Sequence, residues 1–137
     1  MDIAARFDYE RHFPLELVFP DSEKKSGIVF QIRSASSGEA KKVVRKHLDK
    51  VTERRQRGKL IKGDMALQQE LEKAASYIAS WDWGDHTYKG EKPEFSFRKA
   101  VEILDEQDWV YEQVMEAANK VANFTCEPRK PASKPSG

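Results

Sequence analysis

The stretch of sequence that decides the fold is residues 15–33, LELVFPDSEKKSGIVFQIR. Every second residue is apolar in 15–19 and again in 28–32, which is the period of a strand with one buried face. The polar segment between them contains proline, serine and glycine, which favour a turn. We therefore predict an antiparallel β-hairpin. Because an isolated hairpin is marginally stable in water, its apolar face must pack on other elements.

Four segments downstream have the periodicity of amphipathic helices, at about residues 36–57, 64–81, 96–106 and 108–125. Serines begin the first and third segments and Asp108 begins the fourth, and these residue types are preferred helix N-caps. The first helix is expected to bury one narrow stripe, formed by Ala40, Val44, Leu48 and Val51. The second is expected to bury a stripe that ends at a core tryptophan: Leu67, Leu71, Ala74, Ile78 and Trp81.

The last two helices are expected to face the core with Val101, Leu104, Val110, Val114, Ala117 or Ala118, Val121 and Phe124. Since each stripe needs a partner surface, the predicted fold class is α+β, mainly α, with about four helices and one N-terminal antiparallel hairpin. We expect a single globular domain over residues 15–126, after an N-terminal extension at 1–14. Residues 127–137 contain three prolines and no large apolar side chain, which predicts a disordered tail.

Composition excludes several classes of protein. The chain has 137 residues, of which 34% are charged, and its mean hydropathy is −0.77, so no segment is apolar enough to span a membrane. The N-terminal residues lack the basic and apolar regions of a secretory signal, so we expect the protein to stay in the cytoplasm. The single cysteine, Cys126, can form neither an intramolecular disulfide nor a multi-thiolate zinc site.

No catalytic or cofactor motif stands out in the sequence. There is no glycine-rich phosphate loop, nucleophile elbow or paired-carboxylate pattern, so we expect a binding protein without a cofactor rather than an enzyme. The three histidines lack metal-ligand spacing. Asp82, Asp85 and His86 could in principle hold a divalent cation, but the two aspartates more readily shape a turn, and no metal site is predicted.

Charge is strongly segregated along the chain. Residues 41–62 carry ten Lys and Arg against two acids, whereas residues 63–127 carry fourteen acids against six bases. Such a pattern fits helices of opposite charge that pack together, copies that associate with one another, or an anionic partner. For the last case, the basic face would consist of Lys42, Arg45, Lys46, Arg54 and Arg55.

The loop at residues 82–97, DWGDHTYKGEKPEFSF, is too aromatic for a plain linker. Aromatic side chains dominate both protein cores and binding hot spots. Since this loop is bounded by glycine, its aromatic residues can be partly exposed. We therefore predict that a partner contacts Trp83, Tyr88 and Phe95.

The order of these features resembles the tail assembly chaperones of long-tailed bacteriophages. The likeness spans about residues 15–126 and includes the hairpin, the charged helix, and four short motifs: Trp81-Asp82-Trp83-Gly84, Phe95-Ser96-Phe97, Ala100-Val101-Glu102-Ile103-Leu104 and Ala122-Asn123-Phe124. The resemblance implies a non-enzymatic protein of the infected host's cytoplasm. Such a protein coats the long helical tape measure protein before tail tube subunits polymerise around it.

The partners that the resemblance implies are the tape measure protein, the tail tube protein and further copies of the chain. A long helix with exposed apolar stripes aggregates, and a small helical protein can cover such stripes by helix-in-groove docking. The alternative is a small nucleic-acid-binding or virion-connector protein that uses the basic helix at residues 41–62.

Overall fold

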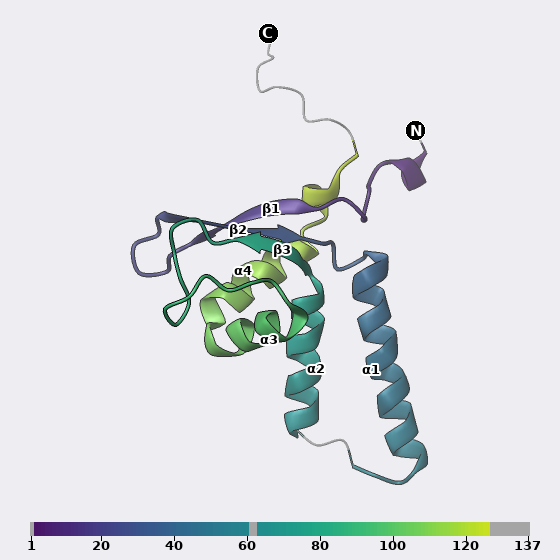
Figure 1. The fold of residues 1–137 in the computed structure, drawn as a ribbon. Coiled ribbons are helices and arrows are strands. Elements are labelled where there is room, and N and C mark those ends of the chain that lie inside the picture. The colour runs from purple at the N-terminus through teal and green to yellow at the C-terminus, as the bar shows by residue number, and fades with distance from the viewer. Residues whose placement is uncertain (1, 61–62, 127–137) are drawn as a thin grey trace.

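The computed structural model describes residues 2–60 and 63–126, and it places helices beneath a three-stranded antiparallel sheet (Figure 1). The strands are β1 (Phe13–Val18), β2 (Lys25–Ile32) and β3 (Ile78–Asp82), in the order β1-β2-β3. The helices are α1 (Gly38–Gln56), α2 (Gly63–Ser76), α3 (Phe97–Glu106) and α4 (Asp108–Asn119), with short 3-10 helices η1 (Ile3–Ala5) and η2 (Val121–Phe124). The α+β, mainly α class and the antiparallel hairpin are confirmed, whereas β3 was not predicted.

The core lies between the sheet and α2, α3 and α4. Phe30, in the central strand, is fully buried, and its ring centroid lies 5.2 Å from that of Trp81 and 6.1 Å from that of Trp83. The alternation predicted for β2 is confirmed, since Ile28 and Ile32 are buried beside it. The helices contribute most of the other fully or almost fully buried side chains, including Ala74, Ala100, Ile103, Leu104, Val110, Val114 and Ala118.

The helix predicted at residues 64–81 is wrong in its last third, because α2 ends at Ser76 and residues 78–82 form β3. Ile78 pairs with Ile32 and Trp81 pairs with Phe30, although 78 and 81 are an odd number of residues apart. A bulge makes this possible, since it adds one residue to β3 and returns both side chains to the same face. Their three-residue spacing therefore imitates a helical stripe.

Arg33 stabilises the point where α2 gives way to β3. Its backbone N–H donates to the carbonyl of Tyr77 at 2.6 Å, and its guanidinium donates to the carbonyls of Ser76 at 3.0 Å and Ile78 at 3.2 Å. Carbonyl groups at a helix C-terminus otherwise have no intrahelical partner. The third strand also covers an edge of the hairpin that would be open to solvent.

The predicted serine caps are present, but the start and end of the last helix differ from the prediction. Ser37 Oγ accepts from the Ala40 N–H at 3.2 Å, and Ser96 Oγ accepts from the Lys99 N–H at 3.0 Å. Asp108 is the first residue of α4 rather than its N-cap. The predicted helix 108–125 stops at Asn119 and η2 follows, so Val121 leaves the apolar face and is 47% exposed instead of lying in the core.

The two described ends of the chain lie against each other. Phe7 and Thr125 form an antiparallel bridge, the Asp8 N–H donates to the Phe124 carbonyl at 2.8 Å, and the Cys126 N–H donates to the Arg6 carbonyl at 2.9 Å. β1 starts within the extension predicted at 1–14, and the tail predicted at 127–137 lies outside the described residues. None of the described helices is both long and apolar enough to span a membrane.

Candidate functional site

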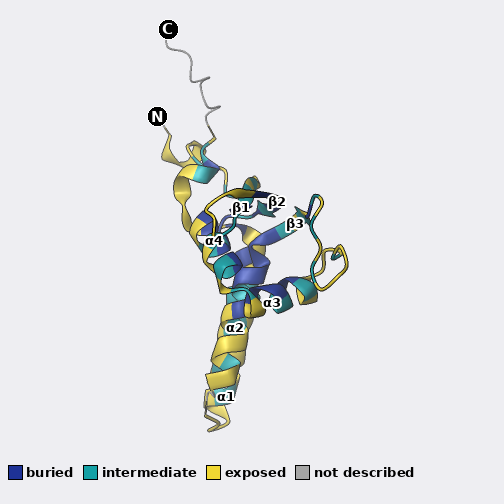
Figure 2. Cartoon of the chain, turned by 90° about the vertical axis from the view of Figure 1, so that its left-hand side faces the viewer, coloured by how far each residue is buried: buried dark blue, intermediate teal, exposed yellow. Residues whose placement is uncertain are grey.

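An arm of two antiparallel helices projects from the rest of the molecule. We define the arm as residues 38–60 and 63–70, and the body as the sheet, α3, α4, η2 and the end of α2. α1 packs along α2, and within the described residues it makes no comparably extensive contact with another element. Figure 2 shows the lower part of the molecule, where α1 runs, as mostly exposed. Ala40 is the one buried residue of α1.

The predicted burial of the α1 stripe is therefore wrong beyond Ala40. Val44 and Val51 are half-buried, and Leu48 is 60% exposed. Leu67, in the first half of α2, is also exposed. The physical reason is that these side chains lie past the edge of the body, where one neighbouring helix cannot enclose them.

A shallow groove of about 280 Å³ runs between the two helices and is called the arm groove here. It is lined by Val44, His47, Leu48 and Val51 of α1 and by Ala66, Gln69, Glu70 and Lys73 of α2. On the α2 side the charges cancel, because Lys73 Nζ lies 3.3 Å from Glu70 Oε2. The amide nitrogen of Gln69 is shielded from solvent and has no hydrogen-bond acceptor among the described residues. The groove therefore offers an apolar centre between the two helices.

A polar contact joins the two helices of the arm. His47 Nε2 lies 2.9 Å from Glu72 Oε1, and the Gln68 amide donates to Glu72 Oε2 at 3.1 Å. Burial raises the pKa of Glu72, but the hydrogen bonds from Gln68 and His47 outweigh it and leave the pKa below the ordinary value of 4.5. The carboxylate is thus held in its charged form, where it helps keep α1 against α2.

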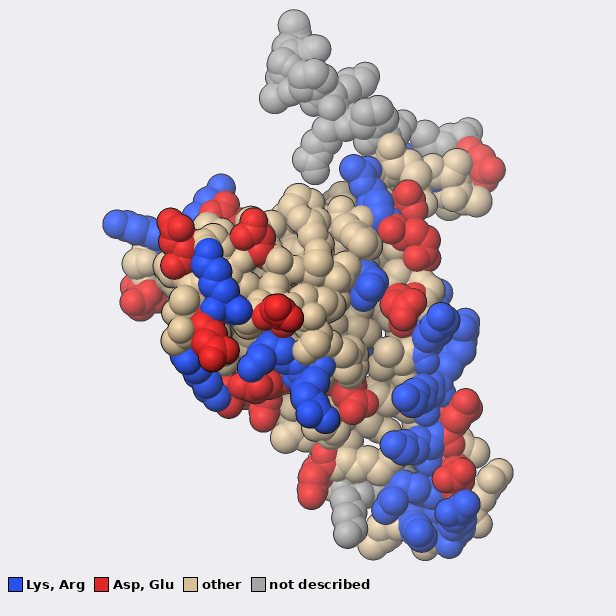
Figure 3. Space-filling model, in the orientation of Figure 1, with Lys and Arg blue, Asp and Glu red and all other residues tan. Residues whose placement is uncertain are grey.

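All five residues of the predicted basic face belong to α1. Lys42, Arg45, Lys46 and Arg55 are exposed, whereas Arg54 is half-buried and donates to the Leu60 carbonyl at 3.0 Å. Figure 3 shows Lys and Arg side chains following α1 from the body toward the tip of the arm, with few acids among them. The structure therefore brings the basic face and the arm groove together on one helix.

In the aromatic region, the burial of Trp81 and Trp83 is the reverse of what was predicted. Trp83 is 8% exposed, with its ring 5.8 Å from that of Tyr88 and its indole nitrogen buried without an acceptor. Trp81, predicted to be core, is half-buried, and its indole N–H donates to the Pro93 carbonyl at 2.9 Å. The exposed position predicted for Trp83 is wrong because the ring packs against Phe30 as the chain leaves β3.

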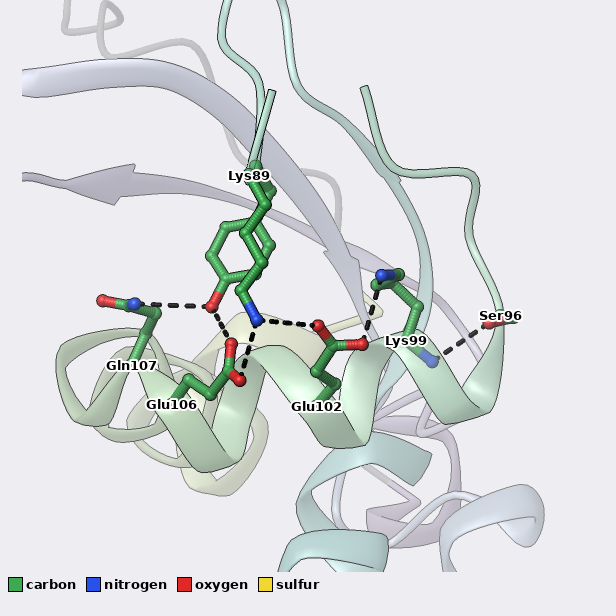
Figure 4. A network of polar contacts seen from close by, with 7 residues as sticks. Lys89, Ser96, Lys99, Glu102, Glu106 and Gln107 are labelled. Carbon is green, nitrogen blue, oxygen red and sulfur yellow. Dashed lines mark hydrogen bonds and ion pairs between the residues drawn. The ribbon is translucent and has the colours of Figure 1, made fainter. Parts of the chain in front are cut away.

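Tyr88 and Lys89 fasten the loop to α3 through hydrogen bonds and ion pairs with its glutamates, and Figure 4 shows Lys89 above Glu102 and Glu106. The Tyr88 hydroxyl donates to Glu106 Oε1 at 2.5 Å, and Lys89 Nζ lies 3.0 Å from Glu106 Oε2 and 3.4 Å from Glu102 Oε2. Hydrogen bonds from Tyr88 and Lys89 lower the pKa of Glu106, while burial and the bond to Glu106 raise the pKa of Tyr88. The network is called the latch below.

Of the three predicted contact residues, the latch leaves only Phe95 at the surface. Phe95 is 38% exposed and meets Trp81 edge-on with ring centroids 5.0 Å apart, whereas Tyr88 is half-buried. A small cavity of about 210 Å³ remains beneath the loop, and its aromatic lining comprises Phe19, Trp83, His86, Tyr88 and Trp109. The loop is thus mainly part of the body.

One of the two aspartates predicted to shape the turn of the loop, Asp82, does so. Asp82 Oδ1 accepts from the Gly84 N–H at 2.9 Å, and His86 Nε2 lies 2.9 Å from the carbonyl oxygen of Ser26. Across residues 2–60 and 63–126, no three His, Cys, Asp or Glu side chains come together in a way that could hold a metal ion.

None of the protein family models, curated proteins or solved structures compared with this chain matches it. Function must therefore be argued from the arm groove, the basic face and the sequence motifs. The position of α1 and its basic residues could be predicted from the sequence. The one signal for the exposure of Leu48 was that its apolar stripe is narrow and has charged residues on both sides.

Proposed function

We propose that this protein is a phage tail assembly chaperone that binds the tape measure protein in the host cytoplasm and keeps it soluble during tail morphogenesis. The observation that carries the proposal is the exposure of Leu48, between Val44 and Val51, on a helix whose one extensive contact within residues 2–60 and 63–126 is with α2. A third helix laid into the arm groove would bury these side chains together with its own apolar stripe. Tape measure helices would otherwise expose such stripes and aggregate.

The shape of the site suits temporary binding. A groove of about 280 Å³ on two helices gives one chaperone molecule a modest contact area, and a long helix would need many copies along its length. Modest contacts allow tail tube subunits to displace the chaperone as the tube grows. The four sequence motifs of the resemblance support the proposal independently of the groove. Phe95-Ser96-Phe97 and the other three motifs lie outside the residues that line it.

Co-expression with the tape measure protein of the same genome tests the proposal. The wild-type chain should raise the soluble yield of that partner, and Leu48→Asp should remove most of the gain because it places a carboxylate in the apolar centre of the groove. The matched control is Val121→Asp, which adds the same charge at an exposed apolar position of the body. A gain that is equal for both variants would place the binding site elsewhere.

The second candidate is a nucleic-acid-binding or virion-connector protein, which the exposed bases of α1 favour. Ionic strength separates the two functions, because phosphate binding through six or more contacts weakens about 10³-fold or more between 50 and 200 mM salt. Apolar burial persists over that range. Retention of duplex DNA with such a steep salt dependence, together with an insoluble tape measure protein, would replace the chaperone proposal with this one.

A further inference from the structure

The side chains of α1 along the arm groove alternate in a pattern that favours one kind of binding partner. Along α1, residues 41, 44, 48, 51 and 55 follow the alternating three- and four-residue spacing of a coiled-coil seam: Lys41, Val44, Leu48, Val51 and Arg55. The spacing places all five along one narrow strip about 21 Å long, or about four turns. The strip is apolar in its centre and basic at both ends.

The two bases at the ends of the strip, Lys41 and Arg55, are exposed, and neither forms an ion pair within residues 2–60 and 63–126. Across the groove, Lys73 is neutralised by Glu70, so α2 offers no opposing charge to the strip. The α1 strip that lines the groove in its centre thus carries a basic residue beyond each end of the apolar side chains.

The side chain of Gln69 lines the same groove, and its amide nitrogen has no acceptor within residues 2–60 and 63–126. A buried polar group without a partner costs free energy, so an occupant that supplies an acceptor oxygen is favoured once this amide turns toward the groove. The basic ends of the strip call for the same kind of occupant, one rich in carboxylate or amide oxygens.

We infer that the arm groove selects an amphipathic helix whose apolar stripe is flanked by glutamate or aspartate, and this inference rests on the proposed function. Leucine-sized side chains of the occupant would pack around Leu48, while its acids would meet Lys41 and Arg55. Electrostatic complementarity of this kind sets the specificity and register of binding more than its strength. The acidic flanks would distinguish suitable segments of a long helical partner from unsuitable ones.

A second copy of the chain fits this description poorly. Its most acidic helix, α4, has exposed Asp108, Glu112 and Glu116, but its apolar residues Val110 and Val114 are buried in the body. It could therefore supply acids without an apolar stripe. Nucleic acid fits less well, because phosphates gain nothing from Val44, Leu48 and Val51.

Two synthetic peptides test the inference by titration against the full chain at low salt. Both are three-heptad amphipathic helices with leucine at the a and d positions, and they differ only in carrying glutamate or lysine at the flanking positions. The glutamate peptide should bind at least about tenfold more tightly. Lys41→Glu with Arg55→Glu should reverse that preference, whereas the control pair Lys92→Glu with Arg98→Glu, at exposed body positions, should keep it.

The other outcomes separate the inference from the function beneath it. If both peptides bind equally and Leu48→Asp abolishes both, the acidic selectivity is wrong while the groove remains a helix site. If neither peptide binds, the groove is not a helix site, and both the inference and the proposed function fail at this location. If the chain instead dimerises and Leu48→Asp makes it monomeric, a second copy occupies the groove and the inference is overturned.

Discussion

Two leucines one turn apart on α2 follow the same sequence pattern but differ in exposure, because one lies in the arm and the other in the body. Leu67 is 58% exposed, whereas Leu71 is 7% exposed. Both belong to the same predicted stripe, and the helix is continuous between them. Residues 63–70 include none that is buried, while Leu71, Ala74, Ala75 and Ser76 all are. Periodicity therefore identifies which face is apolar, and only the neighbouring elements decide whether that face is covered.

The largest expected effect comes from truncating these two leucines in turn. Leu71→Ala should lower the free energy of unfolding by about 2–4 kcal/mol, because it leaves a cavity in the packed body. Leu67→Ala removes the same atoms from the same helix with the same change in propensity, and it should cost about 0.5 kcal/mol or less. Urea denaturation followed by circular dichroism measures both values. Equal costs would mean that the arm is enclosed in solution and that the contrast is wrong.

Much of the body could be predicted from the sequence because its local signals agree with its packing. The hairpin has strand periodicity and a turn, and α3 has a serine cap and a strong apolar face, so both elements lie close to where they were predicted. The boundary between α2 and β3 could not be predicted in the same way. Ile78 and Trp81 match a helical period, and only pairing with β2 and the bulge identify them as a strand.

The candidate site was harder to predict, because its properties depend on where α1 lies relative to the body. Val44, Leu48 and Val51 were identified as one stripe, but the narrow stripe says nothing about how far past the body it extends. Trp83 shows the opposite error. Its place next to Gly84 suggested exposure, yet the third strand directs its ring onto Phe30.

The latch gives the aromatic loop an expected pH window with both an acid and an alkaline limit. Because the pKa of Glu106 is lowered, its contribution is complete above the ordinary value of 4.5 and is lost as pH falls through the lowered pKa. Because the pKa of Tyr88 is raised, its contribution is complete below the ordinary value of 10.0 and is lost as pH rises through the raised pKa. The loop should therefore stay fastened from about pH 4.5 to 10.

Amide signals of residues 84–95, followed by NMR during an acid titration, measure this window. Glu106→Gln should remove most of the acid transition of the loop, since its amide does not titrate, although Glu102 can still contribute through Lys89. Glu94→Gln is the control, because Glu94 is an exposed loop residue outside the latch. A loop that keeps the full wild-type transition in Glu106→Gln would show that the latch does not fasten it.

The smallest expected effect concerns the contact between the two helices at the base of the arm, where Glu72 of α2 lies against His47 of α1. Partly exposed contacts between polar side chains contribute little to global stability, so Glu72→Gln should change the free energy of unfolding by about 0.5 kcal/mol or less. Because the arm is held by few contacts, that loss should appear locally, as roughly twofold faster hydrogen exchange of the α1 amides with body amides unchanged.

The pH dependence of this difference follows from the lowered pKa of Glu72. The difference between wild type and variant should be present above pH 4.5. It should vanish as pH falls through the lowered pKa, where the wild-type carboxylate is protonated too. Glu39→Gln is the matched control, because Glu39 lies 3.8 Å from Lys42 within α1 and, among the described residues, forms no ion pair with a second helix. If both variants speed α1 exchange equally, the effect belongs to α1 itself, and the pair between the helices is not what holds the arm together.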